Sequence, residues 1–484
     1  MANVKKNYLF SVSYQILKII VPIITTPYLS RILGAEMVGI YSYTNSIVQY
    51  FILISMLGIL DYGNRTIASL KSKKERGQVF GEIYFIQFCS SSIALACYFL
   101  YILLFNPPYK RIAIIQGISL VASMVDINWF FFGIEKFKLT VTRNMFIKIA
   151  SLVLIYVCVK SKNDLWKYVS IMVFSTFISN IILWLFIRRE IFFEQVSFKK
   201  AIRHLKPCLI LMLPLLSRSI FVYLDKTMLG IMAGMTETGY YEYSEKIVLA
   251  ATSILTPLGT VMLPRISNLL SKGDEQTAQR YTSLSMDFVV ACGAAFTAGI
   301  MSISDTFVYY FLGSEFRYCG IILKVMSITI LLVGWTNVIR TQYVLPYKKD
   351  KLYMLAVFFG AIVDFIINYA LIPTMGALGA AIGWVAAEIV ITLTQTVYSA
   401  RKLPIQTYIK KDAGFILSAI IMYMILHIIR YSIEGNGLIL LLIEIIFGAI
   451  LYLSLALLYI FFFRKDLWIL TRNYFGRTLN RQRK

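Results

Sequence analysis

About fourteen apolar runs, each long enough to cross a lipid bilayer, dominate this chain of 484 residues. The hydrocarbon core of a bilayer is about 30 Å thick, so a helix needs about 20 residues to cross it. Hydrophobic residues make up 58% of the chain, more than a water-soluble fold of this length requires. We therefore expect an all-α polytopic membrane protein. The predicted helices cover residues 7–31, 38–62, 79–105, 111–134, 142–160, 165–187, 207–233, 239–263, 282–304, 318–345, 352–373, 376–399, 413–430 and 438–463.

Basic residues are distributed unevenly between the connections of these helices. The net charge is +23, which on a soluble protein would suggest a nucleic-acid partner. Here the basic residues lie between apolar runs, and we expect no nucleic-acid partner. With the N-terminus inside, 33 of the 48 Lys and Arg residues fall in inner segments and eight in outer ones. Short cytoplasmic loops carry such an excess, so the count predicts that both termini are cytoplasmic.

A segment of the first half recurs loosely 200 residues later. Residues 34–48 and 234–248 are identical at six of fifteen positions, and two cationic pairs, Lys18/Arg218 and Arg65/Arg265, flank the repeat at the same offset. Two similar halves in a membrane chain are typical of transporters. Six helices per half give both halves the same orientation, a parallel repeat. The predicted division is a lobe at 1–195, a second lobe at 196–400, and an extra helix pair with a basic cytoplasmic tail at 401–484.

Polar residues lie on one face of several predicted spans. Gln15 and Lys18 share a face of the first helix, and Lys18 and Arg218 each lie near mid-span. A cation at that depth costs roughly 2.5–3.5 kcal/mol, so it should face water, a substrate or a partner. We interpret Lys18 and Arg218 as lining a cavity; a structural ion pair with a carboxylate is the alternative. Further candidates for the cavity are Asn45, Gln49, Asp225, Lys226, Glu242 and Lys246.

Some of these residues have simpler interpretations. Lys246 could pair with Glu242 at helical spacing. Asp364 and Glu388 lie near mid-span on adjacent predicted helices, where they could form an ion- or proton-coupling site. Alternatively they pair with Arg340 or with each other and hold the second lobe together. The coupling ion, proton or sodium, is not specified by the sequence.

Several chemistries have no motif in this sequence. A GxxxxGK[ST] run for ATP, an HExxH run and a CxxC pair are all absent, so we expect no cofactor and no metal site. The predicted outer loops are short, which argues against a membrane enzyme. The two histidines, His204 and His427, are interpreted as incidental.

The remaining motifs consist mainly of Gly, Pro, Tyr and charged residues. They are Pro22, Pro27, Arg31, Gly34, Gly39, Tyr41, Tyr43, Gly58, Asp61, Gly63 and Arg65, and in the second half Pro214, Asp225, Lys226, Gly239 and Tyr241. With these residues the chain resembles the bacterial polysaccharide repeat-unit flippases of the Wzx type, within the multidrug/oligosaccharidyl-lipid/polysaccharide exporter superfamily. The resemblance covers essentially the whole chain.

The resemblance implies transport of an undecaprenyl-diphosphate-linked oligosaccharide across a bacterial inner membrane. Predicted helices one, two, seven and eight would line the cavity, and Lys18 and Arg218 would hold the diphosphate. Arg65 and Arg265 would attract the headgroup at the inner entrance, and Arg31 would act near the exit. The glycan would serve capsule, O-antigen or exopolysaccharide synthesis. A monomer is expected, with polymerase or assembly proteins as candidate partners.

The sequence is less consistent with three other functions. A multidrug exporter of the same superfamily often carries cations, and the mid-span Lys18 and Arg218 argue against it. A membrane polysaccharide polymerase would place catalytic residues in a large outer loop. A passive scaffold would not need charges at mid-membrane depth in both halves.

Overall fold

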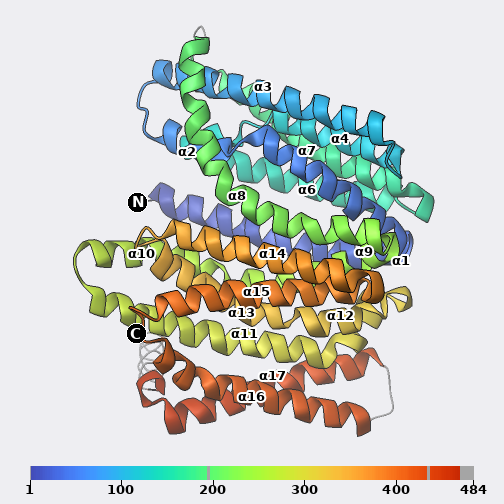
Figure 1. The fold of residues 1–484 in the computed structure, drawn as a ribbon, viewed down its shortest axis with the longest axis vertical. Coiled ribbons are helices and arrows are strands. Elements are labelled where there is room, and N and C mark those ends of the chain that lie inside the picture. Colours follow the sequence, from blue (N-terminus) through green and yellow to red (C-terminus); the bar gives the residue numbers. More distant parts are fainter. Residues whose placement is uncertain (1, 193–196, 433–436, 469–484) are drawn as a thin grey trace. The chain divides into compact units, whose positions relative to one another are not determined.

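The computed structural model describes residues 2–192, 197–432 and 437–468, except for side chains at 2–19, 137, 213–215, 217, 218, 220, 221, 431 and 432. Over the described residues the chain is helical (Figure 1). The helices are α1 (Ala2–Met56), α2 (Ile59–Ala68), α3 (Lys73–Phe105), α4 (Lys110–Met124), α5 (Asn128–Gly133), α6 (Phe137–Cys158), α7 (Leu165–Ile187), α8 (Phe198–Met232), α9 (Met235–Leu255), α10 (Pro257–Ser271), α11 (Glu275–Phe311), α12 (Cys319–Met326), α13 (Ile328–Ile339), α14 (Asp350–Met375), α15 (Ala377–Ser399), α16 (Ile405–Ser432) and α17 (Leu438–Phe463).

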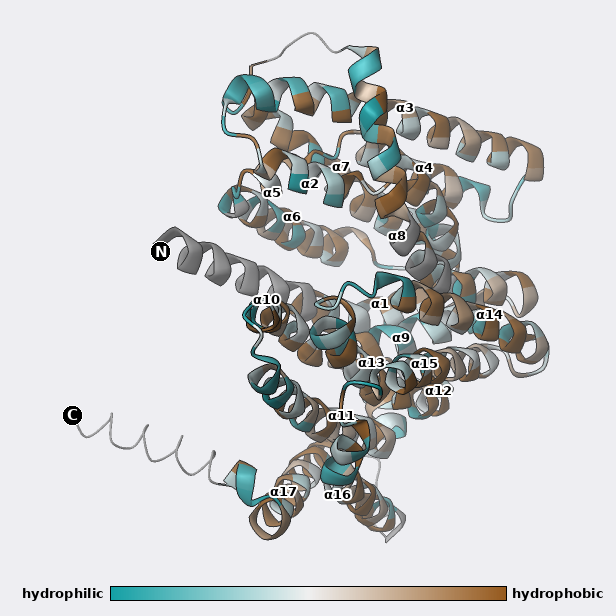
Figure 2. Ribbon diagram, turned by 60° about the vertical axis from the view of Figure 1, so that its left-hand side comes forward, coloured by the Kyte–Doolittle hydropathy of each residue, from teal (hydrophilic) through white to brown (hydrophobic). Residues whose placement is uncertain are grey.

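The predicted fold class is confirmed, with changes at the helix boundaries. Twelve stretches of the described chain are long and apolar enough to cross a membrane, and the first of them, Ile20–Ala68, covers the end of the first predicted helix and all of the second. α8 contains the predicted seventh helix except its last residue, and it begins nine residues earlier. Four predicted helices are each divided by a kink: 38–62, 111–134, 239–263 and 318–345. Figure 2 shows apolar residues along the helix bodies and polar residues concentrated near the helix ends.

Packing divides the chain into two compact units. The first consists of Met1–Glu242 with Ile372–Ala377, and the second of Tyr243–Leu371 with Leu378–Lys484. α8 therefore belongs by packing to the first unit, where it contacts α1, α2 and α3. The repeat in the sequence and the units of packing are thus different divisions. The lobe boundaries at 195 and 400 stay a prediction about the repeat.

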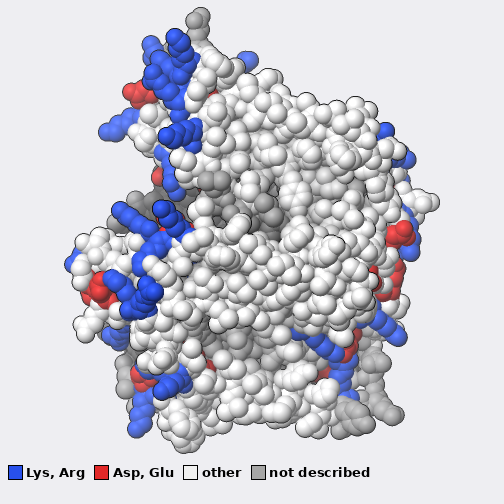
Figure 3. Space-filling view, in the orientation of Figure 1, with Lys and Arg blue, Asp and Glu red and all other residues white. Residues whose placement is uncertain are grey.

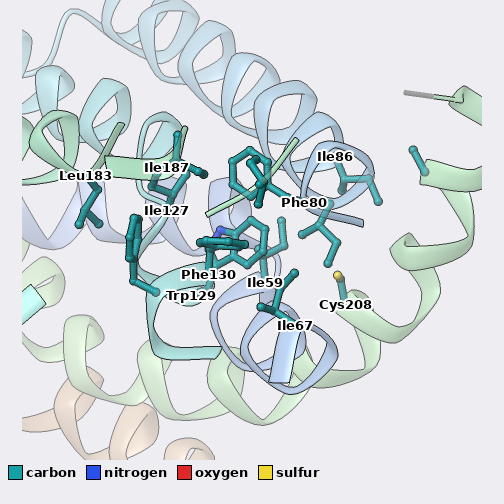
Figure 4. Close-up of a cluster of buried hydrophobic side chains, with 14 residues drawn as sticks. Ile59, Ile67, Phe80, Ile86, Ile127, Trp129, Phe130, Leu183, Ile187 and Cys208 are labelled. Atoms are coloured by element: carbon teal, nitrogen blue, oxygen red, sulfur yellow. The ribbon is translucent and has the colours of Figure 1, made fainter. Parts of the chain in front are cut away.

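A cluster of aromatic and aliphatic side chains joins five helices, α2, α3, α5, α7 and α8, at one end of the first unit. Trp129 of α5 is fully buried against Phe80 of α3, with ring centroids 5.4 Å apart. Trp129 Nε1 donates a hydrogen bond of 2.9 Å to Gln87, so its polar atom is satisfied. Cys208 brings α8 into the same cluster (Figure 4). This cluster fixes the start of α8 against α2 and α3.

Lys and Arg gather at the same end of the first unit. Figure 3 shows them over the beginnings of α3 and α8. The capping box of α3 lies here: Ser72 accepts a hydrogen bond from the Glu75 backbone N–H at 3.1 Å, and Glu75 accepts one from the Ser72 backbone N–H. We call this the basic end, and the opposite end, where α1 reverses at Gly34, the turn end.

In the second unit α11 is the central helix, and it contacts α12, α13, α16 and α17. An ion-pair cluster connects Arg464, the residue after α17, to α11. Arg464 is 4% exposed and donates two hydrogen bonds to Asp287, of 3.0 and 2.8 Å. Its Nη1 also lies 3.5 Å from Asp412 of α16. The sequence count placed Arg464 among the cations of the connecting segments, whereas the structure buries it in a bidentate pair.

Candidate functional site

The sequence repeat is also a repeat of backbone geometry. Gly34 has φ 74° and Gly234 has φ 97°, a region that side-chain-bearing residues rarely adopt. After each turn the helix continues for about six turns and then breaks, at Leu57–Gly58 in the first copy and at Thr256–Pro257 in the second. Short helices α2 and α10 follow, and they carry Arg65 and Arg265. The Gly and Tyr residues that recur at an offset of 200 therefore indicate two copies of one local fold.

The two copies touch each other at matched positions. A Cβ on Gly39 would lie 1.7 Å from the carbonyl oxygen of Met235, and a Cβ on Gly239 would lie 2.0 Å from that of Ala35. Each glycine thus meets the other copy's residue four positions earlier. The Ser42 hydroxyl donates a 2.7 Å hydrogen bond to Glu242, its own counterpart. A contact between counterparts, together with the reciprocal glycine contacts, is the arrangement expected if a local twofold axis relates residues 35–42 to residues 235–242.

Below the turns the structure holds a buried layer of charged residues. Lys226 Nζ lies 2.7 Å from Glu242, and the side chains are 11% and 7% exposed. The Tyr241 hydroxyl donates a short hydrogen bond to Asp225. Two consecutive residues of α8 therefore bind two consecutive residues of α9. Because Glu242 also accepts from Ser42 of α1, its carboxylate links the two copies. A buried pair of this kind is costly to break from one side only.

The next layer toward the basic end is polar and partly exposed. Ser46 and Thr227 hydroxyls lie 3.1 Å apart. Gln49 donates a 3.4 Å hydrogen bond to Asn45, and both side chains are half-buried. The rings of Tyr50 and Tyr223 meet edge-on, with centroids 6.0 Å apart. Of the predicted cavity candidates, Asn45 and Gln49 thus lie on the same side of α1 as the buried layer.

The predicted diphosphate pair, Lys18 and Arg218, lies farther from the glycine turns along the helices than Asn45 and Gln49 do. The side chains of Gln15, Lys18 and Arg218 are outside those that the structure describes, so their contacts stay a prediction. Their backbone positions are matched: Lys18 and Arg218 lie on α1 and α8, each about 24 Å along its helix from the glycine turn. These two helices pack against each other. Two cations at equal depth on adjacent helices would suit a ligand with two negative groups.

The structure places the remaining predicted cations outside the buried layer. Arg65 is exposed. Arg265 lies over the ring of Tyr281, with its Cζ 4.0 Å from the centroid. Arg31 is exposed at the turn end and donates a 3.1 Å hydrogen bond to the Pro27 carbonyl. Lys246 Nζ lies 5.2 Å from the centroid of the Tyr243 ring.

The candidate coupling carboxylates lie in the second unit. Asp364 of α14 is fully buried, and Glu388 of α15 is half-buried. A Cβ on Gly383 would come within 3.1 Å of Asp364, so α14 and α15 pack closely there. Arg340 donates a 3.0 Å hydrogen bond to Asn337 and lies over the ring of Tyr353. No group of three or more metal-ligating side chains occurs within the described part of the chain.

Sequence reasoning missed one polar contact of the first unit. His204, interpreted as incidental, links three helices at the basic end: its Nδ1 lies 2.6 Å from the Tyr62 hydroxyl and its Nε2 2.9 Å from Glu82. Glu82 also accepts a 3.0 Å hydrogen bond from Gln78. The available signal was Glu82, an acidic residue within an apolar run, but the sequence does not indicate which residue pairs with it.

Comparison with known proteins identifies the family. A family model described as polysaccharide biosynthesis protein matches residues 4–270. The chain belongs to the polysaccharide biosynthesis protein family. The matched region includes both copies of the repeat and the buried layer between them. Among curated members, a putative O-antigen transporter from Shigella dysenteriae is 26% identical over 80% of this chain and 98% of its own length.

Solved structures support the fold of this family member. The lipid II flippase MurJ in an inward closed conformation aligns with a TM-score of 0.77 at 15% identity, over 95% of this chain and 99% of that one. A multidrug resistance MATE transporter of the MOP superfamily, in an inward-facing conformation, aligns with a TM-score of 0.56 at 14% identity, over 81% and 96%. At these identities the alignments show a shared fold.

Proposed function

We propose that this chain is a flippase that moves an undecaprenyl-diphosphate-linked oligosaccharide from the cytoplasmic to the outer leaflet of a bacterial inner membrane. In this proposal both termini and the basic end are cytoplasmic, as the distribution of Lys and Arg predicts. The observation that carries it is the pair Lys18 and Arg218, at matched depth on packed helices α1 and α8 of a symmetric repeat. Relationship to a putative O-antigen transporter adds support.

The proposed substrate site holds the diphosphate between Lys18 and Arg218. The half-buried polar residues Asn45 and Gln49 lie between that pair and the buried layer, where they can donate hydrogen bonds to sugar hydroxyls. Arg65 and Arg265 attract the anionic headgroup where it enters from the cytoplasm, and Arg31 acts where the substrate leaves. The Lys226–Glu242 pair is internally neutral, so it contributes little net attraction for an anion.

Transport proceeds by alternating access in this proposal. The glycine contact and the Ser42–Glu242 hydrogen bond close the turn end. Opening toward the outer leaflet separates the two copies and breaks both contacts, while the pairs within the second copy can persist. An inside-negative potential favours outward movement of the negative headgroup by about 2.3 kcal/mol per charge per 100 mV. Asp364 and Glu388 are the candidates for binding a coupling proton or sodium ion.

The alternative is a multidrug exporter, because a MATE transporter shares the fold. Cationic drugs favour an acidic cavity, whereas the matched mid-span residues here are both cations. Expression of the chain in a dye-sensitive host separates the two functions. Efflux of cationic dyes, with no restoration of surface glycan in a flippase-deficient host, would favour the exporter.

The test of the proposed function is complementation. The chain is expressed in a host that lacks its own flippase and makes a known glycan, and surface polymer is measured. The variant Lys18→Ala/Arg218→Ala is expected to reduce export at least about a hundredfold, because two charge-assisted contacts are lost. The variant Lys18→Arg/Arg218→Lys keeps both charges and should retain most export.

A matched control removes two cations elsewhere. Lys199→Ala/Lys272→Ala changes the net charge equally at exposed positions, and it should export normally. Protein in the membrane is quantified for each variant. Normal export by the Lys18/Arg218 double-alanine variant would contradict the diphosphate site.

A further inference from the structure

Two cavities adjoin each other in the second unit, between α11, α16 and α17. One has a volume of about 520 Å³ and is lined largely by polar residues, among them Arg280, Tyr408 and Lys411. The other has a volume of about 670 Å³ and is lined almost entirely by apolar residues. Leu284 and Asp287 line both cavities. The two spaces are therefore neighbouring parts of one amphipathic groove, which involves none of the substrate-site candidates.

The polarity of this groove changes at one level on two helices. On α11, Arg280 and Ser283 line the polar part, and Ala291 and Ala295 line the apolar part. Asp287 stands between them. On α16, Thr407, Tyr408 and Lys411 line the polar part, followed by Phe415, Met422 and Leu426 in the apolar part. These residues recur at helical spacing, so each helix presents one continuous stripe to the groove.

The polar part carries charges of both signs. Arg280 and Lys411 are exposed cations. Asp466 accepts two 3.1 Å hydrogen bonds from Arg464, one at each carboxylate oxygen, and its side chain is 54% exposed, so the oxygens can accept further bonds. Burial alone would raise the pKa of Asp466, but the hydrogen bonds from Arg464 outweigh it and hold the pKa below its ordinary value. Asp466 is therefore ionised at neutral pH, and the cavity offers a carboxylate beside two cations.

A tyrosine of α16 also belongs to the lining of this cavity. Tyr408 is 3% exposed, and its buried hydroxyl has no hydrogen-bond partner among the described residues.

The apolar part is long and open enough for an acyl chain. Its stripe on α11 runs from Phe288 to Ile303, about 22 Å at the helical rise. One leaflet of the hydrocarbon core is about 15 Å thick. Small residues keep the space open: a Cβ on Gly299 of α11 would meet nothing within 4 Å. Gly448 and Ala449 of α17 line the same space.

We propose that this amphipathic groove binds a zwitterionic phospholipid of the surrounding bilayer. Its phosphate lies near Arg280 and Lys411, its ammonium near Asp466, and one acyl chain follows the apolar stripe of α11. Sites for purely anionic lipids consist of basic residues alone. The carboxylate beside the cations is the feature that favours a headgroup with both charges over a polyprenyl diphosphate. The lipid bridges α11 to the α16–α17 pair.

The test is native mass spectrometry of the full chain in mild detergent, offered equal amounts of phosphatidylethanolamine, phosphatidylglycerol and a polyprenyl phosphate. The wild type is expected to retain phosphatidylethanolamine preferentially. Arg280→Ala/Lys411→Ala should retain about tenfold less, as expected for about 1.4 kcal/mol of lost interaction. The control Lys272→Ala/Lys410→Ala removes two exposed cations that do not line the cavity, and it should bind as the wild type does.

Two further variants test the chain and headgroup contacts separately. Gly299→Leu extends a side chain into the groove from a position where an added Cβ meets no atom within 4 Å, so it should fold and lose the lipid, whereas Ala370→Leu on an exposed face of α14 should keep it. Asp466→Asn should shift the preference toward phosphatidylglycerol. Equal lipid retention by wild type and Gly299→Leu, an unchanged preference in Asp466→Asn, or preferential binding of the polyprenyl phosphate would each overturn the proposal.

Discussion

The two copies of the repeat, 18–65 and 218–265, have the same backbone and different charges. Each turns at a glycine with positive φ and breaks near the same place, and they meet through Gly39 and Gly239. At five matched positions the first copy has a neutral polar residue where the second has an ionisable one. The pairs are Thr25/Asp225, Thr26/Lys226, Ser42/Glu242, Asn45/Glu245 and Ser46/Lys246.

This difference separates two roles that a pseudosymmetric site can have. Within the second copy one acid and one base neutralise each other, since Lys226 pairs with Glu242 at 2.7 Å. The first copy supplies hydroxyls that accept or donate without adding charge, as Ser42 does toward Glu242. Cations are kept in both copies at two matched pairs, Lys18/Arg218 and Arg65/Arg265. The cations present in both copies are suited to binding an anionic substrate. The charges present only in the second copy are suited to stabilising the closed contact at the turn end.

The largest effect is expected when one charge of the buried pair is removed. Lys226→Thr gives the second copy the first copy's residue and leaves Glu242 buried without its ammonium partner. Breaking a buried pair from one side costs about 3–5 kcal/mol. The apparent unfolding temperature of the purified protein should fall strongly, and surface expression should fall with it.

The double variant Lys226→Thr/Glu242→Ser sharpens the comparison, because it makes both positions identical to the first copy. It removes both charges, so most of the stability lost by the single variant should return. Lys272→Thr at an exposed position is the matched control. If the double variant is no more stable than the single one, the pair does not hold this layer together.

The sequence was sufficient for the helices and for the existence of the repeat. Long apolar runs and a repeat at a fixed sequence offset can be read directly from the sequence. The length of the runs follows from the thickness of the bilayer, and neither feature depends on which helices pack together. All fourteen predicted segments correspond to helices, but the kinks within 38–62 and 239–263 were not predicted. In the first copy the kink follows a left-handed Gly58, which no propensity rule distinguishes from a packing glycine.

Partners across the fold were less predictable. Glu242 has a nearby cation in sequence, Lys246, and local spacing suggested that pair, which stays a prediction; the structure shows Lys226 of α8 2.7 Å from Glu242, a contact that no local spacing indicates. The same holds for Arg464, which looks like one more cytoplasmic cation until α11 places Asp287 beside it. Such contacts depend on which helices pack together, and a single sequence does not contain that information.

An intermediate effect is expected at the glycine contact between the copies. Gly39→Ala places a Cβ against the Met235 carbonyl, so the two helices must separate. Overpacking of this kind costs about 1–3 kcal/mol. Gly239→Ala should cost a similar amount through Ala35, because the contact is symmetric.

Measurement of apparent unfolding temperatures tests that symmetry. The two alanines share one interface, so their effects in the double variant should add up to less than the two single effects. Gly299→Ala is the control, since a Cβ there meets nothing within 4 Å and the helix gains propensity. A large loss in only one of the two variants would contradict a contact centred on the twofold axis.

The smallest effect is expected at one of the two glycine turns, Gly234. Gly34 has φ 74° and ψ 175°, a region that essentially only glycine occupies, so Gly34→Ala should cost about 1–3 kcal/mol. At Gly234 a Cβ would meet no atom within 4 Å, so Gly234→Ala should lower the stability only through the positive φ of this residue, by about 1 kcal/mol. Unfolding temperatures should therefore rank wild type above Gly234→Ala, and Gly234→Ala above Gly34→Ala. The reverse order would mean that the two turns, although matched in sequence, are held by different forces.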